Sequence, residues 1–438
     1  MRQSDTIFAL SSGAPPSGVA IIRVSGARAK DAVRQLCGAV PEDRKIELVN
    51  LRDNAGELLD RGLAVVFSAP RSFTGEDCTE FHIHGGRASV GAVIDALGHF
   101  DGFRQADAGE FTRRAFVNGK MDLTGVEALG DLISAETAMQ RRFALANADG
   151  SAKALYYGWR QRLLHARAMI EAELDFSDEG DVPGSMADEV WRDVAALAAE
   201  MGAKVAGARK AEILRDGFRV VILGAPNAGK SSLINKLADR DVAIVSDEAG
   251  TTRDLVEVVL DLDGVRVVIT DTAGLRDEPG TIEALGIARA LERAADSDLV
   301  LVLEDLSEPV SIDAPPECEV LRIGSKFDIC VAERGVEYDL LISAKTGVGL
   351  DELIERIRSA ALERVGGWSG DALPFRLRQV ELIRDAREHL CSALSEEREL
   401  ELRAEALRLA GDAIGSIVGE IRTEDVLGRI FSQFCIGK

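Results

Sequence analysis

The stretch "GAPNAGKSS" (residues 224–232) decides the fold of this 438-residue chain. It fits the pattern G-x-x-x-x-G-K-[ST], a loop whose backbone N–H groups cradle nucleotide phosphates between a strand and a helix. The apolar run "FRVVILG" precedes it, and "GKSSLINKLAD" continues it with helical spacing. Lys230 can reach the β- and γ-phosphate oxygens, and the Ser231 hydroxyl is a magnesium ligand. The residues expected around the phosphates are Asn227, Ala228, Gly229, Lys230, Ser231 and Ser232.

Strand-like and helical segments alternate around this loop, from about residue 215 to residue 365. "DLVLVLE", "CEVLRIG" and "EYDLLIS" are β-type runs, and "VEVVLDLDGVRVVIT" is typical of a hairpin that turns at Asp263 and Gly264. Such alternation predicts a doubly wound, mostly parallel sheet. We therefore expect an α/β domain over residues 215–365.

Four short motifs indicate which nucleotide binds. In "DTAG" (271–274), Asp271 is placed to hold the magnesium shell and the Gly274 N–H to contact the γ-phosphate. In "GTTRD" (250–254), the Thr252 hydroxyl is expected to complete that shell. In "SKFD" (325–328), Asp328 would accept hydrogen bonds from guanine N1–H and the 2-amino group, which adenine does not offer. With "SAK" (343–345), the order predicts a Ras-like GTPase domain. The additional residues expected at the nucleotide are Thr251, Thr252, Asp271, Thr272, Ala273, Gly274, Ser325, Lys326, Asp328, Ser343, Ala344 and Lys345.

Two positions depart from the usual GTPase pattern. Ser325 stands where the guanine motif N-K-x-D has Asn, and its shorter side chain predicts weaker guanine binding. Leu275 follows "DTAG", where Ras-type proteins have a Gln that orients the attacking water. Another residue must therefore position the water.

The segments before and after the α/β domain have other patterns of apolar residues. Residues 1–118 contain short β-type runs closed by Gly or Pro and read as an α+β domain, whereas 119–214 and 366–438 have helical spacing. A packing seam of period 3-4 runs through Leu407, Ala410, Ile414, Ile417 and Ile421. We expect one discontinuous helical domain into which the GTPase domain is inserted. Two separate helical domains are the alternative.

The composition narrows the setting. The formal net charge is −22, so any contact with nucleic acid must be local. The six cysteines form no C-x-x-C pair, which argues against a zinc site and a disulfide framework. Neither a secretory signal nor an apolar run of about 18 residues is present. The sequence therefore predicts a cytoplasmic protein with no membrane segment.

Over nearly its whole length the chain resembles the tRNA-modifying GTPase family called MnmE or TrmE. The resemblance lies in "GVAIIRVSG", "SFTGEDCTEFHIHGG", "GEFTRRAFVNGKMDLTGVEALGDLI", the GTPase motifs and "GRIFSQFCIGK". It implies a homodimer with an N-terminal folate-binding domain, and a heterotetrameric or larger complex with an FAD-dependent partner, MnmG or GidA. Together these would modify carbon 5 of the tRNA wobble uridine with an aminomethyl or carboxymethylaminomethyl group. The one-carbon donor would be 5-formyl- or methylene-tetrahydrofolate.

The resemblance also assigns residues. The folate pocket carries over to Arg23, Glu80, Lys120 and Lys438, and the near-terminal cysteine to Cys435, which is either a reactive thiolate or an inert thiol. Glu283 matches the glutamate that orients the attacking water. Potassium-dependent pairing of two GTPase domains would activate hydrolysis, with Asn227 as a potassium ligand. The loop expected to complete the potassium shell contains Ser246, Asp247, Glu248, Ala249, Gly250 and Thr251, of which Ser246, Glu248 and Thr251 are the proposed ligands.

Two other functions are consistent with a phosphate loop. A GTPase switch that binds ribosomal particles without modifying RNA is the main alternative, but it gives the first 120 residues and "FCIGK" no role. A membrane-remodelling GTPase would need a basic amphipathic or lipid-binding segment, which the sequence lacks. An enzyme of tRNA modification is the interpretation that uses the whole chain.

Overall fold

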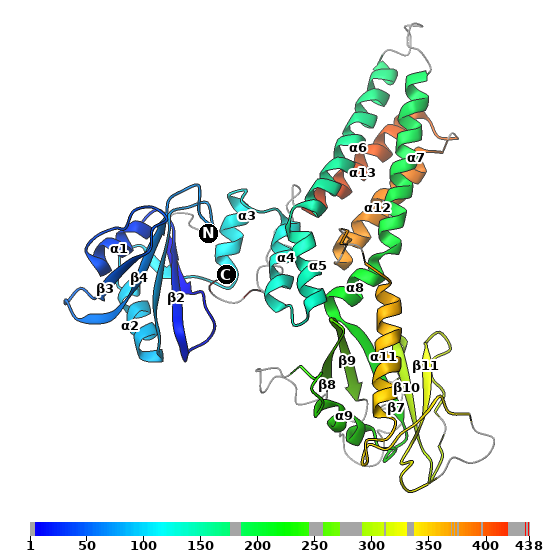
Figure 1. Ribbon diagram of the computed structural model, residues 1–438. Coiled ribbons are helices and arrows are strands. Elements are labelled where there is room, and N and C mark those ends of the chain that lie inside the picture. Colours follow the sequence, from blue (N-terminus) through cyan, green and yellow to red (C-terminus); the bar gives the residue numbers. More distant parts are fainter. Residues whose placement is uncertain are drawn as a thin grey trace, which may run out of the picture. The chain divides into compact units, whose positions relative to one another are not determined.

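The computed structural model describes residues 5–175, 185–244, 257–271, 291–310, 312–330, 337–368, 370–371, 373–374, 376–395, 397–418, 434 and 437. The chain forms two compact units, Met1–Gly130 with Ile414–Lys438, and Asp131–Ala413. We call them unit 1 and unit 2, and Figure 1 shows their elements. Among the described residues, no helix combines the length and apolarity that a membrane crossing demands.

Unit 1 contains a six-stranded mixed sheet in the order β3-β4-β5-β2-β1-β6. β1 pairs antiparallel with β2 and parallel with β6, and the other pairs are antiparallel. The strands are β1 (Thr6–Leu10), β2 (Ser17–Ser25), β3 (Glu47–Arg52), β4 (Leu58–Phe67), β5 (Cys78–Gly85) and β6 (Phe103–Gln105). The helices of this part of the chain are α1 (Ala29–Cys37), α2 (Arg87–Gly98), α3 (Glu110–Val117) and α4 (Leu123–Ser134). The predicted α+β class is confirmed.

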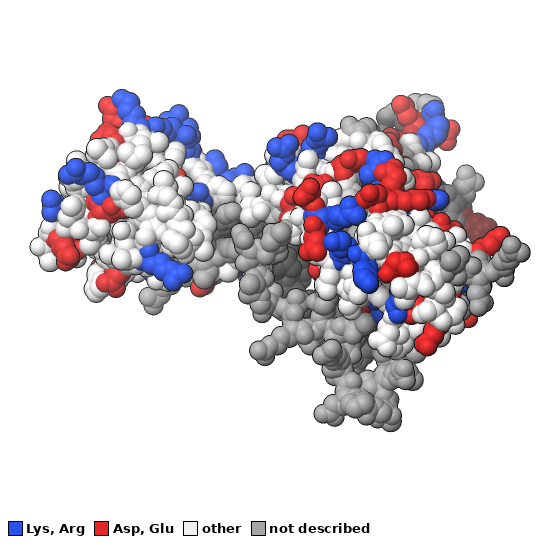
Figure 2. Space-filling model, turned by 60° about the horizontal axis from the view of Figure 1, so that its bottom comes forward, with Lys and Arg blue, Asp and Glu red and all other residues white. Residues whose placement is uncertain are grey.

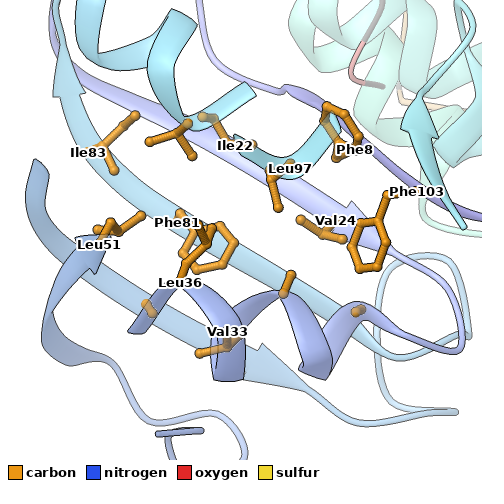
Figure 3. Close-up of a cluster of buried hydrophobic side chains, with 14 of the residues drawn as sticks. Phe8, Ile22, Val24, Val33, Leu36, Leu51, Phe81, Ile83, Leu97 and Phe103 are labelled. Atoms are coloured by element: carbon orange, nitrogen blue, oxygen red, sulfur yellow. The ribbon is translucent and has the colours of Figure 1, made fainter. Parts of the chain in front are cut away.

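The core of unit 1 lies between one face of this sheet and the helices α1 and α2. Alternate residues of β2 and β5, such as Ile22 and Phe81, are fully buried because successive side chains of a strand point to opposite faces. They pack with Leu36 of α1 and Leu97 of α2 in one apolar cluster (Figure 3). The opposite face of β2 and β5 carries both polar and apolar side chains.

A buried carboxylate ties α3 to β6. Glu110 is 3% exposed and accepts hydrogen bonds from Arg104 at 2.6 and 2.8 Å and from Arg114 at 3.1 Å. Burial raises the pKa of Glu110, but hydrogen bonds from Arg104, the Asp107 N–H and Arg114 outweigh this and hold it below its ordinary value. Arg114 also binds Glu76 at 3.0 Å, which fixes the loop before β5.

Unit 2 contains a second six-stranded sheet, in the order β12-β11-β10-β7-β9-β8. Five strands are parallel, and β8 runs antiparallel to β9 at the edge. The turn between β8 and β9 has positive φ at Asp263 (54°) and Gly264 (86°), as a type I′ hairpin requires. The strands are β7 (Phe218–Gly224), β8 (Glu257–Leu262), β9 (Val265–Asp271), β10 (Leu299–Asp305), β11 (Val320–Ser325) and β12 (Leu340–Leu341). Both the doubly wound sheet and the hairpin are confirmed.

The helices of unit 2 come from segments before, within and after this sheet in the sequence. They are α5 (Ala138–Ala148), α6 (Ser151–Asp175), α7 (Ser185–Ala206), α8 (Ala208–Asp216), α9 (Lys230–Ala238), α11 (Leu350–Val365), α12 (Leu377–Ala393) and the part of α13 (Leu400–Val418) that precedes Ile414. α7 packs against both α6 and α12 (Figure 1). The guanidinium of Arg403 lies 3.6 Å from the ring centroid of Trp191, so side chains before and after the insertion meet. The helical domain is discontinuous, as predicted.

The predicted seam of α13 is largely present. Leu407, Ala410, Ile414 and Ile417 are at most 1% exposed. Ile421 lies outside the described residues.

On the face drawn in Figure 2, basic and acidic side chains are interspersed among the described residues.

Candidate functional site

The phosphate loop joins the end of β7 to the start of α9. A Cβ on Gly224 would lie 2.5 Å from the carbonyl oxygen of Leu303, so this position has room only for glycine. Asn227 (φ 66°) and Gly229 (φ 98°) adopt the left-handed conformation, which only Gly and, less readily, Asn accept at low cost. The loop lies where the strand order changes direction, between β7 and β10, which is the usual ligand position of such sheets.

Lys230 is the first residue of α9 and is 6% exposed. Its Nζ donates hydrogen bonds to the carbonyl oxygens of Gly224 (2.7 Å) and Ala225 (2.9 Å). Burial lowers the pKa of Lys230 below its ordinary value, and the Asp271 carboxylate only partly opposes this shift. The ammonium group is thus held over the loop, where the phosphate oxygens of a nucleotide are expected.

Ser231 and Asp271 come together beside Lys230. Ser231 Oγ donates a hydrogen bond of 3.0 Å to Asp271 Oδ2, and Asp271 is 1% exposed. Asp271 is the last residue of β9, and its register partner on β7 is Ile222, two residues before the loop. A hydroxyl and a carboxylate oxygen suit the hard Mg²⁺ ion, so these residues fit the metal that the sequence predicts.

The predicted guanine residues lie at the same edge of the sheet. Ser343 Oγ donates a hydrogen bond of 2.7 Å to Asp328 Oδ1, which orients that carboxylate. Ser325 ends β11 and its Oγ donates a hydrogen bond of 2.7 Å to the carbonyl oxygen of Ala228. The short Ser325 side chain therefore still connects the base motif to the phosphate loop. Ala344 and Lys345 lie in the turn that follows Ser343.

Sequence reasoning missed one partner in this region. Lys326 has a φ of 59°, and its Nζ lies 2.5 Å from Asp305 Oδ2 at the end of β10. Burial raises the pKa of Asp305, but hydrogen bonds from Lys326 and Ser307 outweigh it, so this pKa lies below its ordinary value. The position of Asp305 at the end of an apolar run was the available signal, because parallel strands end at one edge.

Two of the folate candidates lie on β2 and β5 of unit 1, on the sheet face opposite the core. Arg23 on β2 and Glu80 on β5 are register partners, and Arg23 Nε donates a hydrogen bond of 2.9 Å to Glu80 Oε1. The guanidinium also lies 5.0 Å from the ring centroid of Phe73 and 5.7 Å from that of Phe111. Arg23 is therefore held in place and is not a freely mobile surface cation.

Lys120 meets the same loop between β4 and β5 that carries Phe73. Its Nζ donates a hydrogen bond of 2.9 Å to the carbonyl oxygen of Pro70, and its Cγ would lie 3.2 Å from a Cβ on Gly75. His82, two residues after Glu80 on β5, is given no role by any motif in the sequence and was not predicted. Its Nε2 is buried with no hydrogen-bond partner among the described residues, 3.6 Å from Glu80 Oε2.

Comparisons with known proteins cover both units. Residues 123–435 match the MnmE helical domain family, and residues 6–120 match the family described as GTP-binding protein TrmE N-terminus. A protein named tRNA modification GTPase MnmE from Chelativorans sp. is 55% identical over 99% of this chain and 98% of its own length. The chain belongs to the MnmE family of tRNA modification GTPases. This membership favours tRNA modification over a switch that only binds ribosomal particles.

Two further MnmE relatives agree with the assignment. The protein from Mesorhizobium japonicum is 53% identical over 100% of both chains, and that from Brucella melitensis is 52% identical over 99% of this chain and 98% of its own. A solved G domain of the T. maritima FeoB iron transporter covers 33% of this chain and 98% of its own, at 24% identity and a TM-score of 0.25. At that score the structural likeness adds no argument to MnmE membership.

Several residues that the GTPase motifs or the MnmE resemblance assign lie outside the described residues. Most belong to the two stretches that follow α9 and β9. The others are near the C-terminus. These residues are Ser246, Asp247, Glu248, Ala249, Gly250, Thr251, Thr252, Thr272, Ala273, Gly274, Glu283, Cys435 and Lys438. Their roles stay predictions.

Proposed function

We propose that this chain hydrolyses GTP and uses the hydrolysis to drive modification of carbon 5 of the tRNA wobble uridine. The observation that carries the proposal is the arrangement of Lys230, Ser231 and Asp271 at the carboxyl edge of the sheet. An ammonium over the loop, with a hydroxyl and a carboxylate beside it, is what phosphoryl transfer with magnesium requires. Membership of the MnmE family supports tRNA as the molecule that is modified.

Guanine is the proposed base. The Asp328 carboxylate, oriented by Ser343, would accept from the two N–H donors of guanine. Ser325 does not supply the amide of the usual Asn, but its bond to the Ala228 carbonyl oxygen keeps base and phosphate motifs together. Ser231 and Thr252 are the proposed magnesium ligands. The ion would neutralise charge on the phosphate oxygens.

A tetrahydrofolate with a one-carbon unit is the proposed second ligand, held by Arg23, Glu80, Lys120 and Lys438. The Arg23 guanidinium is planar, already oriented by Glu80 and two aromatic rings, and suits a carboxylate of the folate tail. Lys120, whose Nζ donates to the carbonyl oxygen of Pro70, offers a second cation beside the loop between β4 and β5. The folate would supply the carbon atom, as the 5-formyl or methylene derivative.

Hydrolysis is proposed to need a second copy of the chain. Two GTPase domains would meet around potassium ions, with Asn227 as a ligand together with Ser246, Glu248 and Thr251. A monovalent cation there neutralises charge that develops between the β- and γ-phosphates. Glu283 would orient the attacking water, since Leu275 cannot. The left-handed backbone of Asn227 is compatible with this role.

The remaining assignments complete the proposal. An FAD-dependent partner of the MnmG or GidA type joins a homodimer of this chain in the cytoplasm. Cys435 acts as a thiolate during the modification. The proposed domains are 1–118 for folate, 119–214 with 366–438 for the helical domain, and 215–365 for GTP.

Mass spectrometry of tRNA nucleosides tests the function. Cells that lack this chain should lose the aminomethyl and carboxymethylaminomethyl uridines that their parent strain contains. Reintroduction of the wild-type chain should restore them. Identical nucleoside profiles in the deletion strain and its parent would refute the proposal.

A further inference from the structure

Strand β9 has its two ends in two functionally different places within unit 2. At its carboxyl end, Asp271 accepts the hydrogen bond from Ser231 of the phosphate loop. At its amino end, Arg266 contacts the helical domain. Five residue steps separate Arg266 from Asp271, a span of about 16 Å at roughly 3.3 Å a residue. One short strand thus joins the nucleotide site to the helices.

Arg266 makes two hydrogen bonds to helical segments that precede it in the sequence. Its Nε donates a hydrogen bond of 2.7 Å to Glu136 Oε2, just before α5, and its Nη1 donates one of 2.7 Å to the carbonyl oxygen of Asp216, the last residue of α8. The side chains of Arg266 and Glu136 are 23% and 34% exposed, so water screens their attraction only in part. The planar guanidinium fixes both directions at once.

The hairpin turn makes a backbone contact beside this ion pair. The N–H of Met139 in α5 donates a hydrogen bond of 3.3 Å to the carbonyl oxygen of Gly264. A Cβ on Gly264 would be 3.6 Å from that nitrogen, which is ordinary packing distance. We call the two bonds Arg266–Glu136 and Met139–Gly264 together the hairpin–α5 contact.

α5 is rigidly held where it meets the hairpin. Thr137 and Gln140 form a capping box at its start. Gln140 is 8% exposed, and its Oε1 also accepts from the N–H of Glu136 at 2.9 Å. Its Nε2 donates a hydrogen bond of 2.6 Å to the carbonyl oxygen of Arg215 in α8. A displacement of the hairpin therefore acts on a fixed helix end and is not absorbed by a loose side chain.

The hairpin is also continuous in sequence with both stretches expected to sense the γ-phosphate. β8 begins at Glu257, three residues after "GTTRD" ends, and β9 ends at the first residue of "DTAG". β8 and β9 are paired from Glu257 with Thr270 to Leu262 with Val265. A hydrogen-bonded pair of strands moves as one body more readily than a loop does.

We propose that the β8–β9 hairpin carries the nucleotide state of the GTPase domain to the helical domain, through the hairpin–α5 contact. Arg266 is a positioning residue, since it acts on Glu136 and lies at the end of β9 away from Asp271. The inference rests on the proposed function only in requiring that GTP and GDP bind at the phosphate loop. It names the residues through which the GDP-bound and GTP-bound states of the phosphate loop would affect the helices, as coupling between two sites requires.

Hydrogen–deuterium exchange on the full-length chain tests this connection. The readout is the exchange rate of the peptide that covers α5, which includes the Met139 N–H, in GDP and in a non-hydrolysable GTP analogue. In the wild type the two nucleotides should give different rates. In Arg266→Met that difference should shrink by about threefold or more, while nucleotide affinity is unchanged. An equal rate in both nucleotides for the wild type would overturn the proposal.

The matched control is Arg358→Met. Arg358 of α11 binds Asp263 Oδ2 of the same turn at 2.5 Å. This variant therefore removes a guanidinium group that contacts the hairpin and leaves the hairpin–α5 contact intact. It should keep the full nucleotide difference in α5. Glu136→Gln removes the other charge of the ion pair and should reproduce Arg266→Met. If Glu136→Gln retains the full difference, or if Arg358→Met loses it as completely as Arg266→Met, the hairpin–α5 contact is not the connection.

The two hypotheses fail separately. Normal wobble nucleosides in a deletion strain would refute the proposed function but leave the exchange experiment on purified protein valid. Loss of those nucleosides, combined with nucleotide-independent exchange in α5, would refute the hairpin connection alone.

Discussion

The Nζ atom of Lys230 lies 2.7 Å from the carbonyl oxygen of Gly224, so the cation of the phosphate loop is bonded to the loop itself. Its low exposure and lowered pKa show that the site holds this charge at some cost. A phosphate group would replace neutral carbonyl partners with charged ones, which form stronger hydrogen bonds with an ammonium group. The loop is therefore suited to bind an anion.

Lys230→Ala should remove nucleotide binding. Loss of two charge-assisted hydrogen bonds predicts an affinity reduced by about 100-fold or more. Titration calorimetry with GDP measures the change. Lys236→Ala, at the other end of the same helix, is the control and should bind GDP as the wild type does. Unchanged affinity in Lys230→Ala would show that the nucleotide binds elsewhere.

Asn227→Gly should remove the preference for potassium. Glycine accepts the φ of 66° without strain, so this variant deletes the proposed ligand and leaves the backbone conformation in place. The wild type should hydrolyse GTP faster in potassium than in sodium, and Asn227→Gly should show about equal rates in the two salts. A variant that still prefers potassium would exclude Asn227 as a ligand.

Arg23→Ala should weaken folate binding by about 10- to 100-fold, because a charged hydrogen-bond donor is lost and Glu80 is left without its cation. Fluorescence titration with 5-formyltetrahydrofolate measures this loss. Arg61→Ala changes a cation on the same sheet face, where Arg61 binds Asn50, and should leave the titration unaltered. GTP hydrolysis should stay at the wild-type rate in both variants. Equal folate affinities in the two variants would contradict the assignment.

Cys435→Ser should block tRNA modification and preserve GTP turnover, since a hydroxyl does not form a comparable nucleophile at neutral pH. Nucleoside analysis and phosphate release are the two measurements. Cys391→Ser, at an exposed free thiol, is the control. Modification retained by Cys435→Ser would reduce this cysteine to a packing role.

The local parts of the fold could be predicted from the sequence. The phosphate loop and the strand and helix on either side of it lie within one short stretch of sequence. The hairpin could be predicted because Asp263 and Gly264 accept a positive φ. The alternation of strands and helices was enough to predict the doubly wound sheet. Asp328 and Asp271 could be assigned to one site because parallel strands end at the same edge of the sheet.

The remaining parts depend on pairings between distant residues. Arg23 and Glu80 meet because β2 and β5 pair in one particular register, and a shift of one residue would put them on opposite faces. The bond from Gln140 to the Arg215 carbonyl oxygen joins the ends of two helices 75 residues apart. No local sequence pattern predicts either contact. Only the resemblance to a family could therefore suggest Arg23 and Glu80 as folate-binding residues.

The most direct measurement of whether hydrolysis drives the tRNA chemistry uses Glu283→Ala in a strain that lacks the wild-type chain. Purified Glu283→Ala should bind GTP as the wild type does but release no phosphate above background. Mass spectrometry of the strain's tRNA should then show unmodified wobble uridine, as in a strain that carries Lys230→Ala. Fully modified wobble uridine in the presence of a chain that binds GTP without cleaving it would contradict the coupling of the two reactions.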